Sequence, residues 1–206
     1  MAIELLHRKE SVILTVIDII DQLGIQGLST REIAKRQGIS EGTLFRHFRT
    51  KNEIMLAVLE YFSKFDADIF KSTSLKGMKS EEAILYYVST YATYYQNYPA
   101  ITAITQLYGM LGHEPSLADK VQSILKNRMD FLVQLIEKGQ QTGEIRPDID
   151  SSALADLING VCGSICLRWR LAKYTFPLYE KTMAAVEMLL DAFCLRPVNK
   201  MMGGCE

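Results

Sequence analysis

Helix-capping residues recur at short intervals between positions 29 and 51, and this spacing restricts the fold of the 206-residue chain more than any other feature. Ser29 stands three residues before Glu32, which is the spacing of a capping box at a helix start. Gly38 can end that helix, because glycine takes the left-handed C-terminal conformation without strain. Ser40 can cap a second helix, and Thr50 opens another capping box. Residues 29–48 therefore predict two short helices joined by a tight turn, with a longer helix after them.

Apolar residues in this segment fall where they would face a core. Ile33 and Ala34 give the first helix a short apolar side, and Ile39 lies in the turn. Leu44 and Phe48 are four residues apart, so they share one face of the second helix. This is the pattern of a helix-turn-helix, which places its second helix in the major groove of DNA.

The outward face of the second helix is polar, small or basic once the apolar pair is turned inward. Gly42 would let the backbone approach a groove wall. Thr43 and His47 can bond phosphate oxygens, and Arg46 can bond a guanine edge or a phosphate. Glu41 completes this face.

Positive charge is concentrated in the same segment. Residues 29–51 contain six Lys or Arg and two Glu, a net charge of +4, whereas the whole chain carries −1. DNA affinity depends largely on the neutralisation of phosphates. The positive charge therefore lies in the segment where a DNA-binding chain needs it. The alternative is a solvated helical hairpin with incidental lysines. The caps, the turn glycine, the apolar spacing and the charge together favour DNA binding.

The segments Ser-Thr-Arg-Glu-Ile-Ala at 29–34, Gly-Ile-Ser-Glu-Gly-Thr-Leu-Phe-Arg-His-Phe at 38–48, and Lys51 resemble the N-terminal signature of the tetracycline-repressor (TetR) family of bacterial transcription regulators. Residues 13–24 are similar to the first helix of that family, and the resemblance covers about residues 8–56. It implies phosphate contacts at Thr43, His47 and Lys51, with residues 40–46 in the major groove. The predicted DNA-binding residues are Thr30, Arg31, Ser40, Glu41, Gly42, Thr43, Phe45, Arg46, His47 and Lys51.

Phe45 departs from the family pattern. Many members have a tyrosine there, whose hydroxyl bonds a phosphate. Phe45 lacks that hydroxyl, so its ring is left to pack against the sugar backbone or the helix core.

The rest of the chain predicts an all-α protein of about nine helices. Besides the two short helices, helical periodicity covers about 6–23, 51–72, 80–98, 100–111, 116–141, 151–172 and 178–194. We expect a three-helix DNA-binding domain at 1–50, with the helix-turn-helix motif at 29–48. A larger ligand-binding and dimerisation domain follows at 51–196, with a disordered tail at 197–206.

Composition favours a soluble globular protein, and we expect it in the cytoplasm with its thiols reduced. Hydrophobic residues make up 48% of the chain, and the mean hydropathy is near zero. Charges at Glu4, Arg8, Lys9 and Glu10 interrupt any N-terminal signal. No apolar run approaches the ~20 residues of a membrane-spanning helix.

Cysteines and histidines give no metal or cofactor pattern, so we expect neither. Cys162 and Cys166 are one helical turn apart in a small, apolar segment, which is typical of buried thiols that pack as small hydrophobes. A redox or metal pair would need a nearby histidine or a second cysteine pair.

Seven of the ten tyrosines fall between 86 and 108. Tyr87, Tyr91, Tyr94 and Tyr98 form one helical stripe, which indicates either ordinary packing or one wall of an amphipathic cavity. The predicted effector pocket consists of Phe62, Phe65, Tyr87, Tyr91, Tyr94, Met110, Phe131 and Trp169. Hydrophobic drugs, fatty acyl groups and aromatic metabolites would suit such walls equally well.

The last two helices are apolar over a wide arc, which favours a second helical partner. Small residues Gly160, Gly163 and Ser164 would allow close approach. In the resembling family these helices pair with their copies in a second subunit, and a two-fold dimer reads a palindromic operator in double-stranded DNA. The predicted interface is Leu157, Val161, Ile165, Val186, Leu190 and Phe193.

The resulting interpretation is a homodimeric repressor that a small effector releases from its operator. One alternative is a DNA-binding protein that responds to a protein partner and to no effector. An all-helical enzyme is the third class, but the chain lacks clustered histidines, paired carboxylates in an apolar run and phosphate-loop glycines.

Overall fold

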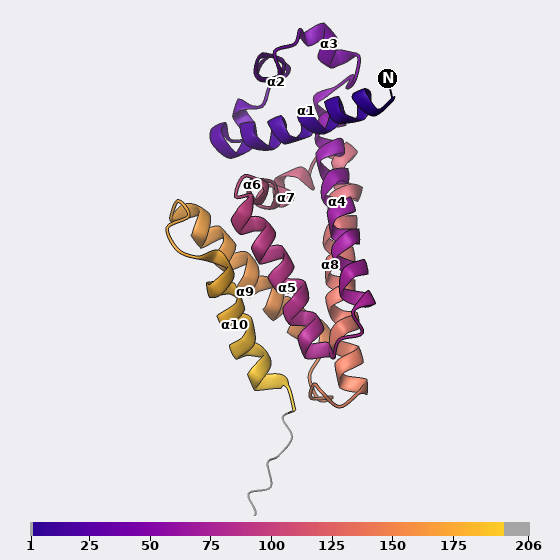
Figure 1. Ribbon diagram of the computed structural model, residues 1–206, viewed down its shortest axis with the longest axis vertical. Coiled ribbons are helices and arrows are strands. Elements are labelled where there is room, and N and C mark those ends of the chain that lie inside the picture. Colours follow the sequence, from indigo (N-terminus) through magenta and orange to yellow (C-terminus); the bar gives the residue numbers. More distant parts are fainter. Residues whose placement is uncertain (1, 196–206) are drawn as a thin grey trace, which may run out of the picture.

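The computed structural model describes residues 2–195, with side chains from residue 9, and confirms the all-α prediction (Figure 1). The predicted tail at 197–206 lies outside the described residues. Ten α-helices form between residues 2 and 195: α1 (Ala2–Leu23), α2 (Thr30–Gln37), α3 (Glu41–Phe45), α4 (Lys51–Leu75), α5 (Ser80–Asn97), α6 (Ile101–Thr105), α7 (Tyr108–Leu111), α8 (Pro115–Gln141), α9 (Ser151–Leu171) and α10 (Leu178–Phe193). No described helix combines the length and the apolar character needed to cross a membrane.

The caps form largely as the sequence indicates. The Ser29 hydroxyl accepts a hydrogen bond from the Glu32 backbone N–H at 3.1 Å, and the Ser40 hydroxyl caps α3 through the Thr43 N–H. Gly38 ends α2 with φ +63°. The Ser29 capping box is only half formed, because the Glu32 carboxylate accepts from Arg36 Nε at 2.8 Å instead of reaching back to the cap.

Two predicted boundaries differ from the structure. Helix α3 ends at Phe45, so residues 46–48 lie beyond it. The predicted helix at 100–111 is two short helices, α6 and α7. The hydroxyls of Thr102 and Thr105 donate to carbonyls three residues earlier, at Pro99 and Thr102, which competes with regular helical hydrogen bonds.

The helices form an elongated molecule with α2 and α3 at one end (Figure 1). Helix α4 runs away from that end and packs along α8 and α5. Helices α9 and α10 pack on each other on the opposite side, with α5 against α10. The long helix α4 therefore connects the end that carries α3 with the interior of the larger helical bundle.

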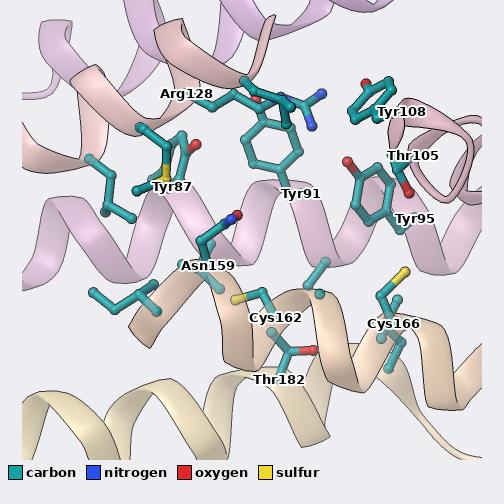
Figure 2. A pocket seen from close by; sticks show the side chains of 18 of the residues that line it. Tyr87, Tyr91, Tyr95, Thr105, Tyr108, Arg128, Asn159, Cys162, Cys166 and Thr182 are labelled. Carbon is teal, nitrogen blue, oxygen red and sulfur yellow. The ribbon is translucent and has the colours of Figure 1, made fainter. Parts of the chain in front are cut away.

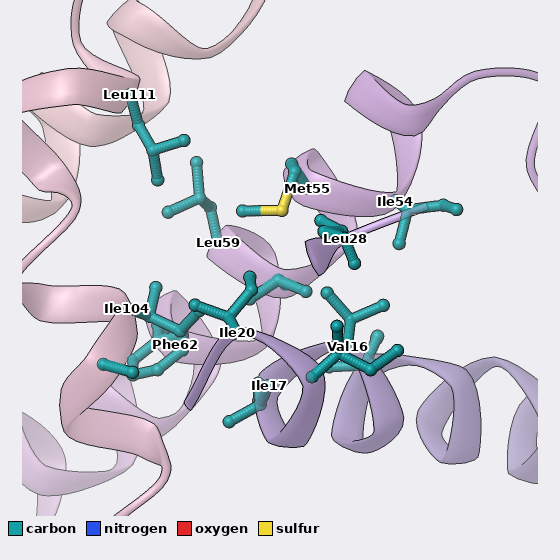
Figure 3. Close-up of a cluster of buried hydrophobic side chains, with 14 of the residues drawn as sticks. Val16, Ile17, Ile20, Leu28, Ile54, Met55, Leu59, Phe62, Ile104 and Leu111 are labelled. Carbon is teal, nitrogen blue, oxygen red and sulfur yellow. The ribbon is translucent and has the colours of Figure 1, made fainter. Parts of the chain in front are cut away.

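One buried hydrophobic cluster extends across the predicted domain boundary, which falls at the start of α4 (Figure 3). Val16 and Ile20 of α1 lie in this cluster with Leu59 and Phe62 of α4 and Ile104 of α6. Because protein interiors are close-packed, a shift of α4 or α6 must also move or strain α1. A second cluster joins α4, α5, α8, α9 and α10 lower in the bundle.

Candidate functional site

The surface formed by α2, α3 and the segment leading to the start of α4 presents the residues predicted to bind DNA, and none of them is buried. Thr30, Thr43 and His47 are half-buried. The exposed members are Arg31, Ser40, Glu41, Gly42, Phe45, Arg46 and Lys51. The apolar partners Ile33 and Leu44 are fully buried, as the helical spacing predicted.

Hydrogen bonds arrange this surface in the free protein. The Thr30 hydroxyl donates to Glu41 Oε2 at 2.6 Å, which ties the start of α2 to the start of α3. Arg46 Nη2 donates to Thr43 Oγ1 at 3.1 Å. Glu41 therefore holds the two helices together and repels phosphate, whereas Thr43 and Arg46 form one polar unit.

Basic side chains around α3 remain available to phosphate. Glu32 forms ion pairs with Lys35 and Arg36, so these two cations are partly neutralised. Among the residues with described side chains, the other four cations of residues 29–51 form no ion pair: Arg31, Arg46, Arg49 and Lys51. Lys51 begins α4, where the N-terminal end of the helix also attracts anions.

Phe45 is 45% exposed and does not pack into the core. Packing of the ring in the helix core does not fit this placement, whereas packing against the sugar backbone of DNA does. His47 follows the end of α3 in a turn, so it reaches the same surface without being part of the helix.

A cavity of about 230 Å³ lies inside the larger bundle, between α5, α8, α9 and α10 with the α6–α7 segment at one end (Figure 2). Aromatic and aliphatic side chains form most of its wall, with a few polar groups among them. The principal polar or aromatic lining residues are Tyr87, Tyr91, Tyr95, Thr105, Gln106, Tyr108, Arg128, Asn159 and Thr182.

The tyrosine stripe contributes to this wall, but in a different register from the one predicted. Tyr87 and Tyr91 line the cavity, and Tyr95 continues their four-residue spacing. Tyr94 and Tyr98 lie instead along an open groove on the other side of α5. A strict four-residue period would have identified Tyr95 from the sequence.

The other six predicted pocket residues, counting Tyr94, do not line the cavity. Phe65 stacks on Tyr94 with ring centroids 3.7 Å apart. Phe62 and Trp169 are buried in hydrophobic clusters, and Met110 is exposed. Phe131 stacks on Phe70 in an outer hollow between α4 and α8.

Arg128 and Tyr108 line the cavity although neither was predicted to do so. Arg128 occupies a position in the apolar stripe of α8, between Leu125 and Leu132, and a lone charge on such a stripe was the available signal. Its guanidinium makes a bidentate ion pair with Asp66 of α4, at 2.8 and 2.9 Å. The Tyr91 hydroxyl also donates to Asp66, at 2.6 Å. A cavity wall on α5 and α8 is thereby bonded to α4.

Cys162 and Cys166 also line the cavity. Burial raises the pKa of the Cys162 thiol to about 12 and that of Cys166 to about 11, so both stay protonated at neutral pH. Thiolate is the reactive and metal-binding form, which makes these side chains poor nucleophiles. The described residues contain no group of three or more His, Cys, Asp or Glu placed to hold a metal ion.

The predicted dimer interface needs a correction. Val186 and Leu190 are fully buried within the single chain, and Ile165 is also buried, because these side chains pack against neighbouring helices of the same bundle. A partner subunit cannot reach them. Val161 and Phe193 are half-buried, and Leu157 is exposed. The exposed large apolar residues of α9 and α10 are Leu157, Leu167, Leu171 and Met188.

Comparison with known proteins places the chain in a family. The family "Bacterial regulatory proteins, tetR family" matches residues 17–58, and "YsiA-like protein, C-terminal region" matches residues 60–192. The chain therefore belongs to the TetR family of transcription regulators. It is a DNA-binding regulator and not an enzyme.

Individual relatives are distant but similar over most of their length. The chain is 21% identical to the "Fatty acid metabolism regulator protein" of Bacillus subtilis (strain 168), over 87% of this chain and 92% of that protein. The solved structure of FadR from Bacillus subtilis in complex with stearoyl-CoA has a TM-score of 0.77 at 20% identity, covering 88% of this chain and 97% of that one. The ketosteroid regulator KstR2 of Mycobacterium tuberculosis has a TM-score of 0.78 at 17% identity, covering 92% and 96%.

Proposed function

We propose that the protein is a homodimeric repressor that binds a palindromic operator and is released by a small hydrophobic or aromatic effector in the cavity of the larger domain. The observation that carries the proposal is the bonded link from the cavity wall to α4. Arg128 lines the cavity, and its partner Asp66 is on the helix that begins at Lys51. An effector that moves Arg128 would thus act on the helix leading to the DNA-binding domain.

The shared hydrophobic core supports the second half of this route. Leu59 and Phe62 of α4 pack with Ile20 of α1 and Ile104 of α6, so movement of α4 is passed to the DNA-binding helices. An effector shifts the equilibrium only by its difference in affinity for the two states, and allosteric coupling is typically about 1–3 kcal/mol. That amount would reduce operator binding roughly 5- to 150-fold.

The size of the cavity favours a compact effector. Ligand pockets usually have volumes of roughly 300–1,000 Å³, and this cavity is smaller. We therefore favour a compact hydrophobic molecule over one as large as the stearoyl-CoA bound by the Bacillus subtilis regulator.

Exposed apolar residues on α9 and α10 support the dimer. Leu157 and Leu171 lie on one side of α9, where Gly160 has open space around it. Met188 is exposed on α10. A two-fold dimer built on these helices would present two copies of α3 to half-sites one or more DNA turns apart.

The proposal is tested with genomic DNA and a blocked cavity. Fragments retained by the purified protein should share a palindrome with a two-fold symmetric footprint.

A blocked cavity tests the effector. An organic-solvent extract of the source cells should release the wild-type protein from the operator fragment. Gly163→Leu should remain bound, because Gly163 lines the cavity and has room for a side chain. Sedimentation velocity must first show that this variant is still a dimer, since Gly163 is also exposed on α9. Gly109→Leu, on α7 outside the cavity, is the control. Equal release of Gly163→Leu, or no release of any variant, would contradict an effector in this cavity.

A further inference from the structure

We propose that the Asp66–Arg128 ion pair makes the cavity selective for an apolar ligand with an uncharged oxygen acceptor, and against carboxylates and cations of the same shape. The inference rests on the proposed function in that it concerns the same cavity. It names the chemical class of ligand and the residues that select it.

The ion pair is built into the wall and is almost fully enclosed. The side chains of Arg128 and Asp66 are 14% and 5% exposed. Arg128 lines the cavity, whereas Asp66 lies behind it and lines the separate outer hollow between α4 and α8. The Arg128 guanidinium lies over the Tyr91 ring, 5.1 Å from its centroid. Packing and hydrogen bonds therefore fix its orientation.

Several groups that face the cavity are hydrogen-bond donors without an acceptor among the described residues. A guanidinium has five N–H groups, and Asp66 accepts from Arg128 Nε and Nη2. The remaining N–H groups include both of those on Nη1. Within the described part of the chain, the buried hydroxyls of Tyr108 and Thr182 donate to no acceptor. Figure 2 shows the Arg128 guanidinium above Tyr91 and directed toward Tyr108, which lies above Tyr95. A ligand oxygen between Arg128 and Tyr108 would accept from the buried Tyr108 hydroxyl and from the Arg128 N–H groups that Asp66 does not use.

The cavity is otherwise uncharged. Among the residues that the structure describes, no Asp, Glu, Lys or His lines the cavity, so Arg128 is the one charged lining residue, and Asp66 neutralises it. Burial raises the pKa values of Tyr87, Tyr91, Tyr95 and Tyr108, which keeps their hydroxyls protonated. The thiols of Cys162 and Cys166 are protonated for the same reason.

These charges decide between ligand classes. A carboxylate would lose its hydration and add a negative charge beside an arginine that Asp66 already neutralises, which is unfavourable in a buried site. A cation would face the N–H edge of the guanidinium. A carbonyl oxygen would accept hydrogen bonds from the same donors without a net charge.

Three probes of one shape test this selectivity by calorimetric titration of the DNA-free protein. They are 5-phenyl-2-pentanone, 4-phenylbutanoate and 4-phenylbutylamine, which differ mainly in the charge of the terminal group. We expect the ketone to bind at least about tenfold more tightly than either charged probe. Equal or tighter binding of the carboxylate or the amine would overturn the inference, and so would failure of all three to bind.

Two variants locate the selectivity. Tyr108→Phe should weaken ketone binding about fivefold, because it removes a donor that finds no acceptor among the described residues. Tyr94→Phe, in the groove outside the cavity, should leave it unchanged. Unaltered affinity in Tyr108→Phe would contradict the placement of the acceptor.

Asp66→Asn leaves Arg128 without its counter-charge, so the ketone-to-carboxylate affinity ratio should fall at least about tenfold. An unchanged ratio in the folded variant would refute the role of the ion pair. If Asp66→Asn does not fold, the three-probe comparison and Tyr108→Phe decide. Selective ketone binding that leaves operator binding intact would contradict the proposed function but not this inference. Operator release by the carboxylate alone would contradict this inference but not the proposed function.

Discussion

Arg170 on α9 and Asp21 on α1 are joined by a hydrogen-bonded ion pair, with Arg170 Nη2 donating to Asp21 Oδ1 at 2.7 Å. Arg170 Nη1 also donates to the Pro99 carbonyl at 3.0 Å and to Thr102 Oγ1 at 2.8 Å. One guanidinium thus holds together the C-terminal parts of α1 and α9 and the start of α6. It is a polar link between the DNA-binding helices and a helix of the cavity wall.

Arg170→Met should loosen this link while keeping the aliphatic stem. We expect a loss of about 2 kcal/mol in the free energy of unfolding, as for other hydrogen bonds to charged groups. Hydrogen exchange at the C-terminal end of α1 should become faster. Arg168→Met is the control, because Arg168 is exposed and contacts only the Phe176 ring among the interactions described for it. Equal stability and exchange in both variants would show that the ion pair contributes nothing to this link.

Lys51→Ala should weaken binding to all DNA sequences, because Lys51 is exposed at the start of α4 and is predicted to contact phosphate. The slope of log affinity against log salt should fall by about one unit. Fluorescence anisotropy with operator and unrelated duplexes measures it. Lys64→Ala, thirteen residues further along α4 and also exposed, should leave the slope unchanged. An unaltered slope in Lys51→Ala would remove that residue from the phosphate contacts.

The sequence predicted the DNA-binding end well because its signals are local. Caps, a left-handed glycine and the spacing of Leu44 and Phe48 act within a few residues, and the structure reproduces them at Ser29, Gly38 and Ser40. The C-terminal end of α3 was harder to predict from the sequence. Residues 46–48 continue the helical spacing but leave the helix in a turn that leads to Thr50.

The cavity was harder to predict because it depends on which faces of different helices converge. The tyrosines of α5 cover more than one face, and only the packing of α8 and α9 decides that Tyr95 faces inward while Tyr94 faces the outer groove. Arg128 and Asp66 are 62 residues apart, so no local pattern could pair them. The interface prediction was wrong at Val186 and Leu190 for a similar reason. The sequence does not show which apolar face of α10 packs inside its own chain and which remains exposed to a partner.

Met188→Glu should convert the proposed dimer into monomers. Met188 is 72% exposed on α10, so the substitution leaves the folded chain intact but places a charge in the proposed interface. Sedimentation velocity measures the change. Leu75→Glu is a closely matched control, since Leu75 is 75% exposed at the end of α4. A dimeric Met188→Glu protein would place the interface elsewhere.

Leu190→Glu should behave differently from Met188→Glu. Leu190 is 0% exposed and belongs to the core of the single chain, so the buried carboxylate should unfold the protein instead of dissociating a folded dimer. Circular dichroism at 25 °C separates the two outcomes. A fully helical monomer would contradict the placement of Leu190 in the core.

The cavity thiols should make the folded state sensitive to alkaline pH. Burial raises the pKa values of Cys162 and Cys166 to about 12 and about 11, from 9.0 for an unperturbed thiol. The unfolded chain therefore releases these protons first as the pH rises. The stabilisation is fully present below pH 9 and is lost as the pH rises through the folded-state values.

Urea denaturation at pH 7.5 and pH 10 measures this effect. The free energy of unfolding should fall by about 1 kcal/mol for each thiol between these pH values. The double variant Cys162→Ala/Cys166→Ala should lose that part of the dependence, whereas tyrosine ionisation affects both proteins alike and cancels in the difference. Helical signal at pH 10 without urea checks that both proteins are folded there. Parallel pH profiles for the two proteins would contradict this prediction, because they would mean that the thiols ionise as freely in the folded state as in the unfolded one. The enclosure of both thiols on the cavity side of α9 opposes such ionisation.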